Sequence, residues 1–290
     1  MHWAEGFIAV DWGTTNRRAW RIEGGDVAQE FDDDRGVLSV EKQDFPAVVG
    51  EIRERLGDDP MLMAGMIGSN RGWVDAGYVP CPAGLGDVAA ALVWAEAGRT
   101  AIVPGLSIAG PADVMRGEEV QILGAVNAGM VPDDAVVCHP GTHNKWATLA
   151  GGRVTSFRTV MTGEMFSLLK EHSILSDFLV GEMAVDDAFC DGVRRGLEGQ
   201  ALTAELFSVR AGVLLGERRR EDATDFTSGL LIGADVGFGI EGTGGKICVM
   251  GRPELTRLYA AALGIAGREA TEIDGEAAFL AGIKAIAGRI

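Results

Sequence analysis

The sequence contains no long apolar segment and few cysteines for its 290 residues. No apolar run is long enough to span a bilayer, and the N-terminus has no basic region followed by an apolar one. We therefore expect neither a membrane span nor a secretion signal. The four cysteines are far apart and form no CxxC pair: Cys81, Cys138, Cys190 and Cys248. This pattern favours reduced thiols in a cytoplasmic protein over a disulfide framework or a zinc site.

Positive charge is also scarce, with 26 lysines and arginines against 42 aspartates and glutamates and a formal net charge of −16. This balance argues against nucleic acid or an anionic membrane as a partner. An anionic small molecule would need a local basic cluster to bind. Apolar residues make up 47% and charged residues 23% of the chain, as in ordinary soluble globular proteins. The length favours two domains with a substantial buried core.

Glycine, by contrast, is abundant, with 42 residues, and a short glycine-containing phrase occurs twice. In each copy an apolar run, residues 7–12 or 135–140, leads into Gly-Thr-x-Asn and a cation. The first copy reads Gly13-Thr14-Thr15-Asn16-Arg17 and the second reads Gly141-Thr142-His143-Asn144-Lys145. A tight turn of this kind between strands can hold phosphate, because glycine admits close backbone approach while amides, hydroxyls and the cation supply contacts. Two such turns predict a nucleotide held between two domains.

Hydrophobic spacing and turn residues predict strands and helices in both halves of the chain. In the first half we expect strands at 7–12, 18–22, 37–40, 61–66 and 100–103, and helices at 45–56, 85–97 and 118–128. In the second half we expect a hairpin at 135–149, strands at 154–160 and 247–250, and helices at 164–169, 184–216, 226–236, 254–263 and 276–290. Strands followed by helices, behind a leading hairpin, predict an α/β fold with mixed sheets.

A cluster of chain-breaking residues lies just before the second copy of the phrase: Gly129, Pro132, Asp133 and Asp134. We therefore predict two domains, residues 1–130 with the first copy and residues 131–275 with the second. The C-terminal helix 276–290 could pack back on the first domain.

A carboxylate precedes only the first copy of the phrase. Asp11 could hold Mg²⁺ through water beside bound phosphates, or it could be a turn-forming residue. The duplication of the phrase favours the metal role. The matching position in the second copy is His139, followed by Pro140, so a second acidic residue must come from elsewhere if the chemistry needs one. His143 could donate to phosphate or simply be solvated.

Two adjacent carboxylates, Glu118 and Glu119, open the predicted helix 118–128. They could stabilise the helix dipole, or one of them could act as a general base toward an attacking hydroxyl group. Spacing alone leaves both roles open.

Small and polar residues at strand and helix ends mark further candidate contacts. Residues 63–73 could bind a ligand or form an ordinary glycine-rich loop. Residues 157–164 could contact a small anionic sugar acid, or Thr162 could cap the following helix. Gly229, Gly233 and Gly251 could leave room for an adenine ring, or could serve helix packing and a turn.

Taken together, these residues resemble the 2-dehydro-3-deoxygalactonokinases, from end to end of the chain. This family is part of the acetate kinase/sugar kinase/heat-shock protein/actin superfamily. The matching runs are residues 10–16, 63–73, 114–119, 140–146, 157–164 and 228–234. The resemblance implies an α/β fold with two similar actin-like, ribonuclease H-like domains and mixed sheets, flanking an interdomain nucleotide cleft. It also implies ATP-dependent phosphorylation of 2-dehydro-3-deoxy-D-galactonate on its 6-hydroxyl, in galactonate catabolism, with ATP and Mg²⁺ bound.

The resemblance also implies roles for individual residues. Residues 116–119 are similar to the Gly-x-Glu-Glu segment of the exopolyphosphatase branch, which implies that Glu118 is the base, with Asp11 the catalytic partner that holds Mg²⁺. The residues implied for the cofactor are Gly13, Thr14, Thr15, Asn16, Arg17, Gly141, Thr142, His143, Lys145, Gly229, Gly233 and Gly251. Those implied for the sugar acid are Ser69, Asn70, Arg71, Trp73, Arg158, Thr162 and Glu164.

Other functions remain open at this point. The same residues could activate water in a phosphohydrolase of the exopolyphosphatase type, or form a non-catalytic ATP-dependent switch. A kinase acting on another 2-keto-3-deoxy sugar acid, such as the gluconate epimer, is a further alternative. The expected partners are ATP and a small sugar acid, with no nucleic acid or membrane. The sequence leaves the oligomeric state open, a homodimer included.

Overall fold

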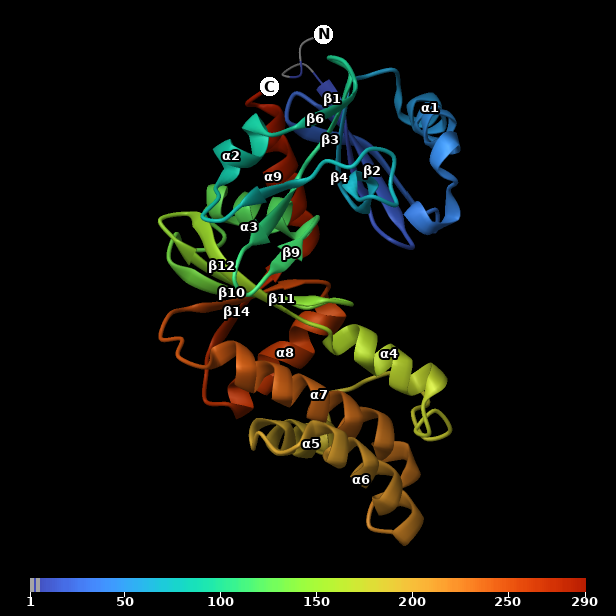
Figure 1. The fold of residues 1–290 in the computed structure, drawn as a ribbon, viewed down its shortest axis with the longest axis vertical. Helices are drawn as coiled ribbons and strands as arrows, with labels where there is room; N and C mark the ends of the chain where they lie inside the picture. The colour runs from blue at the N-terminus through green and yellow to red at the C-terminus, as the bar shows by residue number, and fades with distance from the viewer. Residues whose placement is uncertain (1–2, 4–5) are drawn as a thin grey trace. The chain divides into compact units, whose positions relative to one another are not determined.

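The computed structural model describes residue 3 and residues 6–290 (Figure 1). The strands form three sheets: a six-stranded sheet in the order β3-β2-β1-β4-β7-β6, a five-stranded sheet in the order β12-β11-β10-β13-β14, and a three-stranded sheet in the order β5-β8-β9. The chain divides into two compact units. Within the described residues, no helix combines the length and the apolar composition needed to cross a membrane.

Unit 1 consists of Met1–Asp133, Leu149–Phe157 and Glu276–Ile290. The elements of its first segment are β1 (Gly6–Trp12), β2 (Arg17–Glu23), β3 (Asp26–Asp33), α1 (Phe45–Leu56), β4 (Met61–Gly65), β5 (Tyr78–Pro80), α2 (Leu85–Ala90), β6 (Val93–Glu96), β7 (Thr100–Ile102), β8 (Gly105–Ile108), β9 (Asp113–Met115) and α3 (Glu118–Asn127). The last segment forms α9 (Gly275–Ala287).

The core of unit 1 follows from strand alternation. Because alternate residues of a strand face the same side, Ile8, Val10 and Trp12 of β1 join one buried cluster, which also contains Val49 and Ile52 of α1. Strand β1 pairs antiparallel with β2 and parallel with β4. The carboxyl end of β1 therefore lies beside the carboxyl end of β4, where ligands bind in many α/β sheets.

The C-terminal helix α9 packs against α3 at glycines. A Cβ atom on Gly124 of α3 would lie 2.4 Å from the carbonyl oxygen of Ala278, and one on Gly282 of α9 would lie 2.0 Å from that of Val120. The two helices thus approach more closely than any larger residue at these positions would allow.

Unit 2 consists of Asp134–Thr148 and Arg158–Gly275. The elements from this part of the chain are β10 (Ala135–His139), β11 (Asn144–Ala150), β12 (Arg153–Val160), α4 (Thr162–His172), α5 (Asp187–Leu197), α6 (Leu202–Leu215), α7 (Ala223–Ile240), β13 (Ile247–Gly251), α8 (Pro253–Ile265) and β14 (Ala270–Asp274). Strands β11 and β12 belong partly to each unit. Strand β13 pairs parallel with both β10 and β14.

Glycines also set the packing of α5 against α7. A Cβ atom on Gly229 of α7 would lie 2.1 Å from the carbonyl oxygen of Phe189, and one on Gly233 would lie 2.3 Å from that of Val193. The reverse holds on α5, where a Cβ atom on Gly192 would lie 2.2 Å from a carbonyl oxygen of α7. Gly229 and Gly233 thus face the backbone of a neighbouring helix, and a cofactor contact at either residue stays a prediction.

Most of the predicted elements are confirmed, and three need correction. The expected helix 85–97 ends at Ala90, and β6 follows, because residues 93–96 pair antiparallel with β7. The expected strand 37–40 is a 3-10 helix at Val37–Ser39, and the third strand is instead the polar, largely exposed β3. The expected helix 184–216 is two helices, α5 and α6, since Gly199 between them adopts a φ of +67°. The division into domains at residues 1–130 and 131–275 stays a prediction.

Candidate active site

The turn between β1 and β2, residues 13–16, is the first tip. The Gly13 N–H donates to the Asn16 carbonyl oxygen at 2.9 Å, which closes the turn. Its other carbonyls are held by the following segment: the N–H groups of Gly36 and Val37 donate to the carbonyl oxygens of Thr15 and Gly13 at 2.9 and 3.0 Å. With its carbonyls held from behind, the tip leaves Thr14, Thr15 and Asn16 exposed to solvent. The predicted phosphate-binding residues of this tip are thus accessible.

Asp11 lies beside the first tip. Two glycines near it, Gly65 and Gly117, leave space that larger side chains would fill. A Cβ atom on Gly65, at the end of β4, would lie 3.5 Å from Asp11 Oδ1 and 2.8 Å from the Trp12 carbonyl oxygen. A Cβ atom on Gly117 would lie 3.3 Å from Gly65 Cα. The structure therefore brings Asp11 close to the residue that precedes Glu118, as the predicted site requires.

The two carboxylates at the start of α3 have different surroundings. Glu119 is fully buried, and both its oxygens accept from the Gly117 N–H, at 2.9 and 2.7 Å. Burial, with a smaller contribution from the neighbouring Glu118, raises the pKa of Glu119 to about 8. Glu118 is only partly buried and accepts from the Arg116 N–H at 2.9 Å. Of the two, Glu118 is the one that solvent and a substrate can reach.

Arg17, the cation of the first repeated motif, is buried, and its phosphate contact stays a prediction. Arg17 is 2% exposed; its Nη2 and Nε donate to the Asp33 carboxylate at 2.6 and 3.1 Å. The guanidinium group also lies over the Trp12 ring. The next residue, Arg18, faces the opposite side of β2 and pairs with Asp11 at 2.9 Å. Sequence reasoning missed Arg18, although strand alternation would have separated it from Arg17.

The segment after β4 holds the predicted sugar-acid residues of unit 1. Ser69 is buried, and its hydroxyl donates to the Met66 carbonyl oxygen at 2.8 Å and accepts from the Arg71 N–H at 3.3 Å. This hydroxyl therefore stabilises its own turn, and its substrate contact stays a prediction. The side chains of Asn70 and Arg71 are exposed, whereas Trp73 packs against the core of unit 1.

Arg116 is a further cation that sequence reasoning did not select. Its side chain is 5% exposed, and Nη2 donates to the Gly77 carbonyl oxygen at 3.0 Å. The guanidinium group lies over the Tyr78 ring at 4.5 Å, and a Cβ atom on Gly68 would approach it to 2.9 Å. Arg116 thus packs against residues 68, 77 and 78 and stabilises the segment that carries Asn70 and Arg71.

The turn between β10 and β11, residues 141–144, is the second tip. Its closing bond differs from that of the first tip, because the Gly141 N–H donates to the side-chain Oδ1 of Asn144, at 2.7 Å. Lys145 is 4% exposed and its Nζ donates to the His143 carbonyl oxygen at 2.9 Å. The ammonium group thus stabilises the backbone of the tip, and its phosphate contact stays a prediction. Thr142 and His143 are exposed, and His143 Nε2 lies 2.6 Å from Glu164 Oε2.

A buried carboxylate, Asp235 of α7, lies behind the second tip. Four side chains donate to it: Trp146 Nε1 at 2.8 Å, Thr162 Oγ1 at 2.7 Å, Tyr259 Oη at 2.6 Å, and Asn144 Nδ2. Burial and Asp235 raise the pKa of Tyr259 well above its usual value, which keeps its hydroxyl protonated as a donor. The Thr162 hydroxyl is likewise engaged with Asp235, and the N-cap of α4 is Met161, so the possible role of Thr162 as a helix cap is wrong, whereas its predicted substrate contact stays a prediction.

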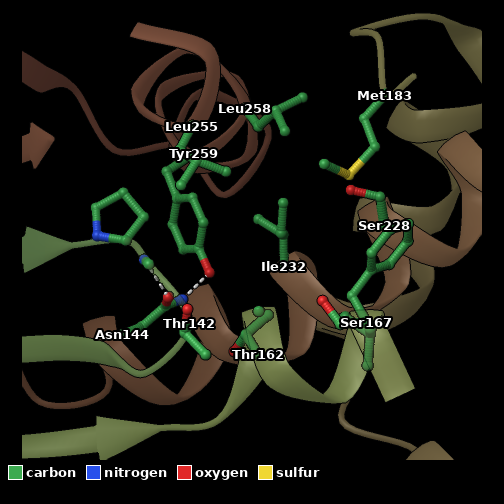
Figure 2. Close-up of a pocket in the computed structure, with 15 residues that line it drawn as sticks. Thr142, Asn144, Thr162, Ser167, Met183, Ser228, Ile232, Leu255, Leu258 and Tyr259 are labelled. Atoms are coloured by element: carbon green, nitrogen blue, oxygen red, sulfur yellow. Dashed lines mark hydrogen bonds between the residues drawn. The ribbon is translucent and has the colours of Figure 1, made fainter. Parts of the chain in front are cut away.

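A cavity of about 220 Å³ opens beside the second tip (Figure 2). Its polar wall includes Thr142, Asn144, Ser167 and Ser228. Most of the remaining surface is apolar and comes from α4, α7, α8 and Met183, with Phe166, Leu231, Ile232, Leu255 and Leu258. Figure 2 shows the Tyr259 hydroxyl directed at Asn144, with Leu255, Leu258 and Ile232 around the open space. The cavity suits a flat apolar group attached to a polar one.

Two other predicted residues of unit 2 lie outside the cavity wall. Arg158 is exposed on β12, with its guanidinium group 5.9 Å from the centroid of the Phe238 ring. At Gly251, the end of β13, a Cβ atom would lie 3.6 Å from the carbonyl oxygen of Pro140, which does line the cavity. A ligand contact of Arg158 or Gly251 stays a prediction.

A sequence model of the 2-keto-3-deoxy-galactonokinase family matches residues 11–286. The chain belongs to this family. It is 37% identical over 293 residues to a 2-dehydro-3-deoxygalactonokinase from Escherichia coli, with 97% of each chain covered. It is also similar to a crystal structure of a Sinorhizobium meliloti protein assigned to the 2-dehydro-3-deoxygalactonokinases, with a TM-score of 0.91, 36% identity, and 97% of this chain and 98% of that chain covered.

A more distant likeness concerns the fold of the family alone. Component A of the (R)-2-hydroxyglutaryl-CoA dehydratase of Acidaminococcus fermentans superposes with a TM-score of 0.51 at 13% identity, covering 98% of this chain and 96% of that one. The predicted fold class is confirmed: this galactonokinase family member has an α/β fold with mixed sheets.

Proposed function

We propose that this member of the galactonokinase family transfers the γ-phosphate of ATP to the 6-hydroxyl of 2-keto-3-deoxygalactonate. The observation that carries the proposal is the family match over residues 11–286, together with 37% identity to a 2-dehydro-3-deoxygalactonokinase over 97% of both chains. The exposed residues of the two tips and the accessible Glu118 supply groups that such a reaction needs. The four free cysteines fit the cytoplasm, where ATP is available.

Glu118 is the proposed general base. A base must be ionised at neutral pH and must reach the proton that it accepts. Glu119 meets neither condition, because it is fully buried and its pKa is about 8. Glu118 is partly exposed and follows Gly117, where an added Cβ atom would lie 3.3 Å from Gly65 Cα. Its proposed role is to accept the proton of the 6-hydroxyl as the oxygen attacks phosphorus.

Asp11 fits a magnesium ion, the metal that ATP-dependent phosphoryl transfer commonly uses. Its carboxylate oxygens are hard ligands, and the absence of a side chain on Gly65 keeps space beside Oδ1. When bound, Mg²⁺ would neutralise charge on the phosphates. In the structure Arg18 Nη2 donates a hydrogen bond to one carboxylate oxygen of Asp11, Oδ2. Because Arg18 pairs with Asp11, we propose Arg18 as a further cation of the first tip.

Unit 2 offers the proposed ATP site. The apolar cavity lined by Leu255, Leu258 and Ile232 suits an adenine ring, and Thr142 on the second tip lines the same cavity. The exposed tip residues would hold the phosphates through backbone N–H groups and hydroxyls. The His143–Glu164 pair is solvent-exposed on this tip. We propose that the pair contacts the phosphates and not the adenine ring.

The carboxylate of the sugar acid needs a cation, and Arg71 is the proposed partner. Its side chain is exposed on the segment that follows β4, next to Asn70. A guanidinium group binds a carboxylate with two parallel hydrogen bonds, which fixes orientation as well as charge. Arg158 is the alternative partner, on an exposed position of β12.

A coupled ADP-release assay across 2-keto-3-deoxy sugar acids tests this function. The proposal predicts ADP release that depends on the sugar acid and is fastest with the galactonate epimer. Faster turnover of the gluconate epimer would change the assigned substrate. ADP release at the same rate without any sugar acid would replace the kinase proposal with a phosphohydrolase.

A further inference from the structure

The buried carboxylate of Asp235 has no role in the proposed chemistry, yet it joins four elements of unit 2. It is 2% exposed on α7 and accepts hydrogen bonds from side chains of β11, α4 and α8. The bond from Trp146 reaches Oδ1, whereas those from Thr162 and Tyr259 converge on Oδ2. A carboxylate offers only acceptors, so it satisfies all of these donors at once.

One of these donors connects Asp235 to the second tip. Asn144 donates from Nδ2 to Asp235 and to the Tyr259 hydroxyl. Its other amide atom, Oδ1, accepts from the Gly141 N–H at 2.7 Å. Because an amide carries its donor and its acceptor on opposite branches, fixing Nδ2 on Asp235 directs Oδ1 toward Gly141.

We propose that Asp235 is a positioning residue for the second tip, which it holds in its phosphate-binding form through the orientation of Asn144. The inference rests on the proposed function in that this tip holds the phosphates of ATP. Asp235 itself is buried and touches no substrate; it acts through Asn144 on the Gly141 backbone. The first tip has no equivalent, since there the closing bond runs to a main-chain oxygen, that of Asn16.

The chemistry of an amide at position 235 makes the inference testable. In Asp235→Asn the new side chain keeps one acceptor and gains an NH₂ group. If its oxygen remains with Trp146, the NH₂ group faces the NH₂ group of Asn144, and the clash is relieved when Asn144 rotates its amide. That rotation turns Nδ2 toward the Gly141 N–H and breaks the closing bond of the tip. The exchanged pair Asp235→Asn/Asn144→Asp restores an acceptor to both neighbours.

The experiment measures the exchange of the Gly141 amide hydrogen and the Kd for ADP in four variants. These are Asp235→Asn, Asn144→Ala, the exchanged pair, and Thr227→Val as the control. Thr227 is also buried on α7, and its hydroxyl bonds only within the helix, to the Ala223 carbonyl oxygen at 2.7 Å. The control therefore loses a buried hydrogen bond of the same helix without changing the tip.

We expect Asp235→Asn and Asn144→Ala to lose protection of the Gly141 amide and to bind ADP about 10-fold more weakly, the equivalent of about one hydrogen bond. The exchanged pair should recover much of the Gly141 protection and of the ADP affinity. Thr227→Val should leave both quantities unchanged. Asn144→Ala breaks the closing bond directly, so it decides the question if Asp235→Asn does not fold. Unchanged Gly141 exchange in a folded Asp235→Asn variant, or no recovery in the exchanged pair, would overturn the inference.

This design separates the inference from the proposed function. Neither readout needs the sugar acid, so a protein that binds ADP but phosphorylates no sugar acid loses the proposed function alone. Conversely, a protein with sugar-acid-dependent ADP release and an insensitive Gly141 amide loses the inference alone.

Discussion

Two neighbouring glutamates at the start of α3, Glu118 and Glu119, differ in their burial. Glu119 is fully buried and has a pKa of about 8, so near neutral pH it is mostly protonated. It accepts from the Gly117 N–H and shapes the turn that leads into the helix. Glu118 remains accessible and follows Gly117, where an added Cβ atom would lie 3.3 Å from Gly65 Cα. One carboxyl group therefore stabilises the turn, and the other is the proposed proton acceptor.

Glu118→Gln is the first prediction at the residue scale. The amide keeps the shape of the side chain but cannot accept the proton of the attacking hydroxyl. We expect kcat to fall by about 10²–10⁴-fold while the Kd for ADP stays unchanged. Steady-state kinetics and calorimetry measure the two quantities. Glu119→Gln is the matched control and should keep most of its activity; equal losses in both variants would contradict the assignment of the base.

The second residue-scale prediction concerns stability and pH. The pKa of Glu119 is raised in the folded state from 4.5 to about 8. Between these values the folded protein binds more protons than the unfolded chain, so the contribution of Glu119 to stability falls as the pH rises. The full loss is up to about 5 kcal/mol, reached above the folded-state pKa.

Glu119→Gln should remove this dependence. Urea unfolding at several pH values from about 5 to 8 should show a smaller decrease of the unfolding free energy in Glu119→Gln than in the parent protein. Glu30→Gln, on the exposed part of β3, is the control that should keep the parent dependence. Identical pH dependence in all three proteins would show that Glu119 is not protonated in the fold.

The site residues also show what the sequence can and cannot predict at this scale. The accessible tip residues and Asp11 lie where the repeated phrase predicts. The burial of the cations Arg17 and Lys145 is not predictable from the motif; each supports its own strand or tip. With Arg17 and Arg18 adjacent, only the register of β2 decides which guanidinium group faces Asp11. That register is set by pairing with β1 and cannot be predicted from the two arginines alone.

At the scale of elements, the α5–α7 pair is held by backbone contact. Gly192 and Gly196 on α5 face Gly229 and Gly233 on α7, and a Cβ atom on any of the four would come within 2.3 Å of a carbonyl oxygen of the other helix. The spacing of Gly229 and Gly233 alone was compatible with either helix packing or an adenine site. The helix-packing role becomes visible only with the partner helix α5, which is distant in sequence.

Gly233→Ala tests this packing. The added methyl group would force the helices apart, and we expect a loss of about 1–3 kcal/mol in the unfolding free energy. Gly237→Ala, one turn further along α7, is the control, because its Cβ atom would lie 3.7 Å from the nearest atom, in ordinary contact. It should be neutral or stabilising by about 0.5–1 kcal/mol. Urea denaturation measures both; a Gly233→Ala variant as stable as Gly237→Ala would contradict close packing.

The accuracy of the element predictions follows the strength of the local signal. Helix α1 is predicted over its full length, 45–56, because its apolar spacing and the Gly57 stop are local features. The strands β5, β8 and β9 are missed, because each is only three or four residues long and gains its conformation by pairing. Strand β3 is missed for a related reason: it is an exposed polar strand without apolar alternation.

At the scale of the whole molecule, the repeated phrase corresponds to a repeated arrangement of strands. In the first sheet the order β2-β1-β4 places the hairpin beside a parallel strand, and in the second sheet β11-β10-β13 does the same. The two copies differ in what supports them. The first tip has Asp11 and the start of α3 nearby, whereas the second has the apolar cavity and the Asp235 cluster. We therefore propose that unit 1 carries the general base and that unit 2 binds the adenine ring.

Amide hydrogen exchange with single ligands tests this division. ADP alone should protect residues 141–144 and the facing parts of α7 and α8, which line the cavity. The sugar acid alone should protect residues 66–73 and 116–119 of unit 1. Protection reports bound-state contacts and local stabilisation. Protection of unit 1 by ADP alone, with none on the second tip, would contradict the assignment.

The most direct test of the central claim is to identify the product. The protein is incubated with ATP, Mg²⁺ and 2-keto-3-deoxygalactonate, and the reaction is followed by ³¹P NMR. The account predicts equal amounts of ADP and a phosphate monoester whose phosphorus couples to the C6 methylene protons. Inorganic phosphate in place of the monoester, or no consumption of ATP, would contradict it.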